Sequence, residues 1–151
     1  MPEPITPEQT RQLAVDLFNE VWALMERDDR TAADDDRMLH AAHASRHHWG
    51  RIGRPENLAR GEWQISRVYT VLGRGEPALY HARRCLDICT EHGIGDWDLA
   101  YAHEALSRAY ETAGDRERAL ASRRDAERAA EGIADADDRE HLARDLQTLP
   151  A

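Results

Sequence analysis

Apolar residues recur at intervals of three and four along most of the chain, which is the spacing of one face of a helix. Thr6 can cap the first such stretch, which runs to about Arg27. Thr31 can cap a second stretch, which ends at Gly53. These signals predict a capping hairpin at residues 6–53. Its core-facing positions are Leu13, Leu17, Val21, Leu24, Met38, Ala42, Ser45 and Trp49.

An internal repeat follows this hairpin. Shifting the sequence by 41 residues superimposes residues 58–83 on residues 99–124 without a gap. Both segments have helical apolar spacing, a central glycine and alanines where two helices must approach. Each unit is therefore predicted to be a helical hairpin, at 56–93 and at 96–132. Identical residues occur at Leu58 and Leu99, Ala59 and Ala100, Ser66 and Ser107, Arg67 and Arg108, Tyr69 and Tyr110, Gly73 and Gly114, Glu76 and Glu117, Ala78 and Ala119, Leu79 and Leu120, and Arg83 and Arg124.

A last amphipathic helix is predicted at residues 135–149. Acidic residues from Asp135 to Asp138 favour a helix start, because they complement the positive end of the helix dipole. Leu142, Leu146 and Leu149 then form its apolar stripe, which can cover the end of the stack. The pattern as a whole predicts a single all-α domain over 1–151, with about seven helices and no strand.

The repeat resembles a known family, the tetratricopeptide repeat. The resemblance covers roughly residues 58–131, with a period of 41 residues where about 34 is usual. It implies a short solenoid of stacked antiparallel hairpins in which the first helix of each hairpin lines a concave groove. It is carried by Leu106-Ser107-x-x-Tyr110, Gly114-Asp115 and Ala119-Leu120 in the second unit, and by Ile65-Ser66-x-x-Tyr69, Gly73 and Ala78 in the first.

The implied groove offers a binding function. Arg67 and Arg108 occupy equivalent positions one repeat apart on its lining. Forked guanidinium groups hold carboxylates through charge-assisted hydrogen bonds, so we expect a peptide or partner protein, or a small acid, to bind there. Alternatively, both arginines pair with nearby Glu62, Glu104 or Glu111 and only stabilise the stack. The predicted lining is Trp63, Arg67, Thr70, Tyr101, Glu104, Arg108 and Glu111.

Histidines suggest a second function. His40, His43 and His47 share one side of the second predicted helix, roughly opposite its core stripe. His43 and His47 are one turn apart, about 6 Å along the axis, at which spacing two imidazoles can bind one metal ion. The alternative function is therefore a metal sensor or metal-dependent enzyme that uses a divalent transition metal such as zinc. A solvated histidine face without a metal is the other interpretation of the same pattern.

The remaining chemistry-bearing residues favour structural roles. Beside the core stripes of their helices, His81 and His103 are expected to form hydrogen bonds between helices. Cys85 and Cys89 lie one turn apart, where core packing is favoured over metal binding. No nucleophile elbow, phosphate-binding loop or dinucleotide fingerprint occurs. We therefore expect a protein without catalysis of its own.

Charge and composition narrow the partners. The 29 acidic residues outnumber the 20 basic ones, all of them arginine, and the net charge is −9. Such a chain repels nucleic acids and anionic membranes. The alanine and arginine usage is typical of a GC-rich bacterial genome. Without a secretory signal, a membrane-spanning stretch or a disulfide framework, we expect a cytoplasmic protein. Exposed end hairpins could also pair in a homodimer.

Overall fold

The chain folds into seven helices and no strand within residues 2–149, which are the residues described by the computed structural model. Met1 and the last two residues of the predicted domain 1–151 lie outside this range. The all-helical fold class expected from the spacing is confirmed. No helix among the described residues is long and apolar enough to cross a membrane. The helices are α1 (Pro7–Met25), α2 (Ala32–Ile52), α3 (Pro55–Val71), α4 (Gly75–Glu91), α5 (Asp96–Thr112), α6 (Arg116–Ala130) and α7 (Ala136–Gln147).

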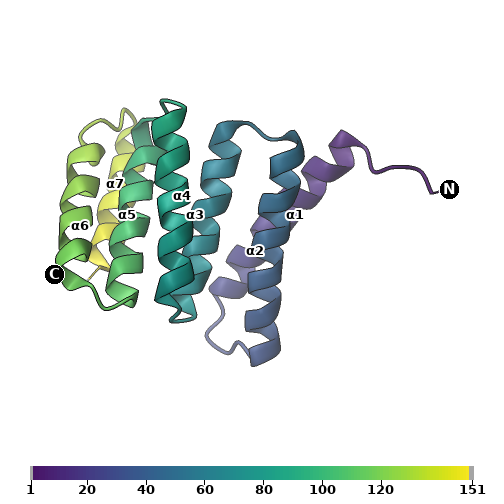
Figure 1. The fold of residues 1–151 in the computed structure, drawn as a ribbon, viewed down its shortest axis with the longest axis horizontal. Helices are drawn as coiled ribbons and strands as arrows, with labels where there is room; N and C mark the ends of the chain where they lie inside the picture. Colours follow the sequence, from purple (N-terminus) through teal and green to yellow (C-terminus); the bar gives the residue numbers. More distant parts are fainter. Residues whose placement is uncertain (1, 150–151) are drawn as a thin grey trace.

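Neighbouring helices pack in pairs, α1 with α2, α3 with α4 and α5 with α6, and α7 lies at the C-terminal end (Figure 1). Local sequence sets the helix starts. Thr6 and Thr31 each form a capping box, in which the threonine hydroxyl accepts a hydrogen bond from the backbone three residues on. The Asp135 side chain caps α7 in a similar way. The short connections leave consecutive helices antiparallel, as predicted.

The two central hairpins are fastened internally by the same hydrogen bond. Ser66 Oγ donates to the carbonyl of Ala78 at 2.8 Å, which joins α3 to α4. Ser107 Oγ donates to the carbonyl of Ala119 at 2.7 Å, which joins α5 to α6. The donors are 41 residues apart, and so are the acceptors. The sequence repeat is therefore also a repeat of geometry.

Glycines shape the turns and the contact between these hairpins. Gly73 and Gly114 have φ values of 74° and 84°, a left-handed conformation that glycine adopts without steric strain. Gly75 serves a different purpose, because a Cβ added there would lie only 2.5 Å from the Cα of Ala113 at the end of α5. The equivalent of Gly75 in the second unit is Arg116. The close approach of Gly75, at the start of α4, to Ala113 therefore forms part of the contact between the two units.

Two gaps between odd-numbered helices differ in width. α3 and α5 contact each other at many residues, whereas α1 and α3 meet at few. Gln64 of α3 spans the α1–α3 gap, and its Nε2 donates to the carbonyl of Phe18 at 3.0 Å. The equivalent residue of α5 is Ala105, which is buried beside Ser66 of α3. A methyl group allows α5 to approach α3 more closely than the longer amide allows α3 to approach α1.

Candidate functional site

Two arginines from consecutive units meet on one buried carboxylate between α3 and α5. Arg67 Nη1 lies 3.4 Å from Glu104 Oε1, and Arg108 Nη2 lies 2.6 Å from the same oxygen. Arg108 Nε also donates to this oxygen, at 2.8 Å. Glu104 is fully buried, and its Oε2 has no hydrogen-bond partner among residues 2–149. One anion thus pairs with two cations at this point.

This cluster carries more positive than negative charge, because Arg67 and Arg108 both contact the single carboxylate of Glu104. Burial and the charge of Arg108 lower the pKa of Arg67, against the attraction of Glu104 and Asp145. Within the described part of the chain, Arg67 forms its one side-chain hydrogen bond through Nη1. Its Nε and Nη2 can still donate. Arg67 therefore has both the charge and the free donors to receive an anionic group.

An open pocket of about 310 Å³ lies at this cluster. It brings together four of the residues predicted for the groove and three that sequence reasoning missed. Two of the missed residues, Val71 and Thr112, are equivalent in the repeat and directly follow the predicted Thr70 and Glu111. The 41-residue shift therefore contained a signal for them. Nothing in the repeat pointed to the third, because it follows α7. The pocket is lined by the predicted Arg67, Thr70, Arg108 and Glu111 and by the additional Val71, Thr112 and Leu149.

The predicted aromatic residues of the groove, Trp63 and Tyr101, do not line this pocket, although Trp63 lines a smaller enclosed space beside Arg67 and Glu104. The Trp63 ring contacts the rings of Trp22 and Tyr101, with centroids 5.3 Å and 5.5 Å away. Tyr101 is buried, and its hydroxyl donates to Asp145 of α7 at 2.7 Å. Burial and this hydrogen bond raise the pKa of Tyr101. Trp63 and Tyr101 thus form part of an aromatic row that joins α1, α3 and α5.

The last helix closes one side of the second unit. Arg108 Nη2 donates to the carbonyl of Asp145 at 3.2 Å and to the hydroxyl of Thr148 at 2.8 Å. With Glu104 on its other side, Arg108 is held in place from α5 and from the end of α7. Glu111 at the rim lies 3.6 Å from Arg116 Nη1. Arg67 is consequently the more available of the two arginines.

The histidines predicted as metal ligands have different surroundings. His40 and His47 are exposed, whereas His43 is partly buried with its Nε2 2.9 Å from the hydroxyl of Tyr69 in α3. Burial and the neighbouring His81 lower the pKa of His43. No group of three histidine, cysteine or carboxylate residues is placed to hold a metal ion in the described part of the chain. His43 thus contributes to the contact of α2 with α3 and α4.

An inter-helix hydrogen bond was expected for His81, and this expectation is confirmed. His81 Nδ1 lies 2.6 Å from Glu62 Oε2 of α3, while Arg46 Nε of α2 donates to Glu62 Oε1 at 3.2 Å. Burial acts to raise the pKa of Glu62, but the hydrogen bond and charge of His81 and the charge of Arg46 outweigh it, and the pKa is lowered. No such hydrogen bond is present for His103 within residues 2–149, although burial lowers its pKa as well.

Comparison with known proteins yields no match. No protein-family model matches the chain, and searches of the curated proteins and of the solved structures also find no match.

Proposed function

We propose that this protein is a tetratricopeptide-like binding scaffold without catalysis of its own. It holds a peptide or partner protein by an acidic group placed in the pocket between α3 and α5. The observation that carries this proposal is the meeting of Arg67 and Arg108 on one oxygen of the buried Glu104, beside an open pocket. An arriving carboxylate would pair with the surplus cation through charge-assisted hydrogen bonds.

The ion pairs with Glu104 agree with the competing interpretation, in which the arginines only stabilise the stack. The free donors of Arg67 favour binding, because a purely structural pair would not need a second arginine on a carboxylate that Arg108 already contacts through two nitrogens. Val71 supports the same proposal, since it is 39% exposed at the pocket. An exposed valine beside a guanidinium suits a peptide that ends in an apolar residue with a free carboxylate.

The test is a screen of immobilised peptides with free C-terminal carboxylates, followed by fluorescence anisotropy with the best binder. We expect Arg67→Gln to weaken binding by about tenfold or more, the value of a charged hydrogen bond. The fold should persist, because Arg108 and Glu104 remain as a one-to-one pair. Arg124→Gln, an exposed arginine on α6, serves as the matched control and should bind as the unaltered protein does.

Two results would reject the proposal. One is equal affinity for Arg67→Gln and Arg124→Gln. The other is equal affinity for a peptide whose C-terminal carboxylate has been amidated, because the pocket would then not recognise the acid. Circular dichroism melting curves of both variants separate a loss of binding from a loss of folding.

A cytoplasmic setting belongs to the same proposal. Cys85 and Cys89 are buried free thiols one turn apart on α4. Thiols persist in reducing compartments, whereas disulfides form in the oxidising environment of secreted proteins. The buried thiols support this setting and the core-packing role expected for both residues.

A further inference from the structure

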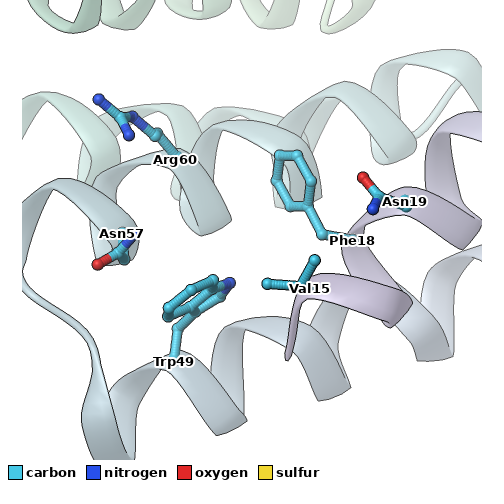
Figure 2. Close-up of a pocket in the computed structure, with 6 residues that line it drawn as sticks. All are labelled: Val15, Phe18, Asn19, Trp49, Asn57 and Arg60. Carbon is cyan, nitrogen blue, oxygen red and sulfur yellow. The ribbon is translucent and has the colours of Figure 1, made fainter. Parts of the chain in front are cut away.

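A second pocket lies in the gap between α1 and α3, apart from the α3–α5 cluster. Its volume is about 180 Å³. Figure 2 shows the rings of Phe18 and Trp49 and the side chain of Val15 around one space, with two asparagines and an arginine at its edges. The lining residues are Val15, Phe18 and Asn19 of α1, Trp49 of α2, and Asn57 and Arg60 of α3.

The size and lining of this α1–α3 pocket suit one aromatic ring. An apolar cavity of about 150 Å³ accommodates benzene, so 180 Å³ leaves room for a ring with one small substituent. Phe18 and Trp49 present aromatic surfaces, against which a third ring gains packing energy beyond its buried area. Drug-sized ligands need about 300 Å³ or more, so a larger molecule would protrude.

The amides at the edges supply hydrogen bonds for such a substituent. Asn57 Oδ1 accepts the backbone N–H of Arg54 at 3.0 Å as part of the cap of α3, which leaves Nδ2 free to donate. Asn19 is exposed, and its side chain has no hydrogen bond within residues 2–149. A carbonyl or hydroxyl oxygen on the ligand can accept from these amides.

The charge of Arg60 is already satisfied. Its Nε and Nη2 donate to the two carboxylate oxygens of Asp98, both at 3.0 Å, and its guanidinium lies 4.5 Å from the Trp97 ring centroid. The hydrogen bond to Asp98 raises the pKa of Arg60. An anionic ligand that drew Arg60 away would leave the Asp98 side chain, 10% exposed, without its partner.

A cationic ligand would meet the guanidinium of Arg60 directly. It would also lie near Arg11, which is 5.3 Å from the Trp49 ring centroid but does not line the pocket. An anionic ligand is thus disfavoured by the Arg60–Asp98 pair. A cationic ligand is disfavoured by Arg60 and Arg11. A neutral ligand avoids both penalties.

We infer that the α1–α3 pocket binds a neutral small molecule made of one aromatic ring with a carbonyl or hydroxyl acceptor. The ring lies against Phe18, Trp49 and Val15, and the acceptor faces Asn57 Nδ2. This site is independent of the acidic-peptide pocket between α3 and α5. Loss of either site leaves the other intact, since the two pockets share no residue.

The test is a titration of the full chain with benzamide, followed by the indole N–H signal of Trp49 in nitrogen-15 NMR spectra. Trp49→Phe identifies this signal among the four tryptophans. We expect benzamide to shift it saturably, and benzoate and benzylamine to bind at least about fivefold more weakly, the cost of one unmade hydrogen bond or disturbed pair. No saturable shift with benzamide, or tighter binding of benzoate, would overturn the inference.

Two variants locate the ligand. Asn19→Trp fills the pocket from an exposed position and should abolish benzamide binding, whereas Ala23→Trp, also exposed on α1 but outside the lining, should not. Asn57→Asp keeps the cap oxygen but removes the donor, so benzamide should weaken by about fivefold while toluene, which has no acceptor, binds as before. Equal binding to Asn19→Trp and Ala23→Trp would overturn the assignment, as would much tighter binding of N-acetylphenylalanine amide, which would indicate a peptide instead.

Discussion

The α1–α3 gap and the α3–α5 gap occupy corresponding places in the stack but are filled by different side chains. Between α3 and α5, the helices lie close together and bury Glu104 under two arginines. Between α1 and α3, the helices lie further apart and leave a pocket lined by two aromatic rings and two amides. Side chains at equivalent repeat positions account for the contrast, because Gln64 stands where α5 has Ala105.

This contrast shows that stacked helical hairpins of the same kind can form two kinds of site. A small residue at the helix contact brings the backbones together, and the remaining polar groups must then satisfy one another. A long amide at that contact holds the helices apart through the carbonyl of Phe18. The space that remains is lined mainly by uncharged side chains, and its one charged residue, Arg60, is already paired with Asp98.

The largest effect is expected for Glu104→Gln. Without the carboxylate, Arg67 and Arg108 face each other in a buried site with no anion between them. Loss of one partner of a buried ion pair costs about 3 kcal/mol or more in the free energy of unfolding. Urea denaturation followed by circular dichroism measures this change.

Glu111→Gln is the matched control for this prediction. Glu111 is partly exposed and lies 3.6 Å from Arg116, so its loss should cost about 0.5 kcal/mol or less. If both variants lost the same small amount, the cluster at Glu104 would not be a buried ionic contact.

An exchange of the equivalent residues tests the helix spacing with a smaller expected effect. Ala105→Gln forces an amide into the closely packed α3–α5 contact and should cost about 2 kcal/mol. Gln64→Ala removes the hydrogen bond to Phe18 and should cost about 1 kcal/mol. Both are measured as the free energy of unfolding in urea. A larger loss for Gln64→Ala than for Ala105→Gln would contradict the proposed role of the alanine in close packing.

The smallest effect concerns pH and the polar contact of α2 with α3 and α4, where His43 meets Tyr69. The pKa of His43 is lowered in the folded protein, so the unfolded chain binds a proton more readily at this residue. The resulting stability is fully present above the unfolded pKa of about 6.5 and is lost as the pH falls toward the lower folded value. Urea denaturation at pH 8 and at pH 5.5 should show this decrease.

His43→Gln isolates the contribution of this residue, because it should make the decrease smaller. His40→Gln, an exposed change on the same helix, should leave the decrease as it is in the unaltered protein. His103 also has a lowered pKa, so part of the pH dependence should persist in both variants. A decrease of unchanged size in His43→Gln would show that this imidazole does not contribute.

The helices were predictable because their signals are local. Threonine caps, glycine turns and the apolar period lie within a few residues of the structure that they specify, as at Thr6, Thr31 and Gly73. The 41-residue repeat predicted that Arg67 and Arg108 would occupy equivalent places. The sequence offers Glu62, Glu104 and Glu111 as partners for these arginines, and the repeat alone does not distinguish among them.

The features that sequence reasoning missed depend on distant segments. Leu149 reaches the α3–α5 pocket because α7 folds back beside α5, and the angle of that return is not encoded in any local pattern. The side of α2 that carries His43 could be deduced, but its contact with Tyr69 requires the distance between α2 and α3. The α1–α3 pocket likewise depends on how far apart two helices lie, which no spacing of residues along one helix reveals.

The glycine at the junction of the hairpins limits how the architecture can grow. Gly75 makes room for the backbone of Ala113, whereas the equivalent Arg116 would push a long side chain into any helix placed in the same relation to the second unit. An array made by copying the second unit at the 41-residue period would therefore place an arginine against the backbone of the next copy at every junction. Designers who wish to lengthen the stack would have to restore a glycine there, once for each added copy.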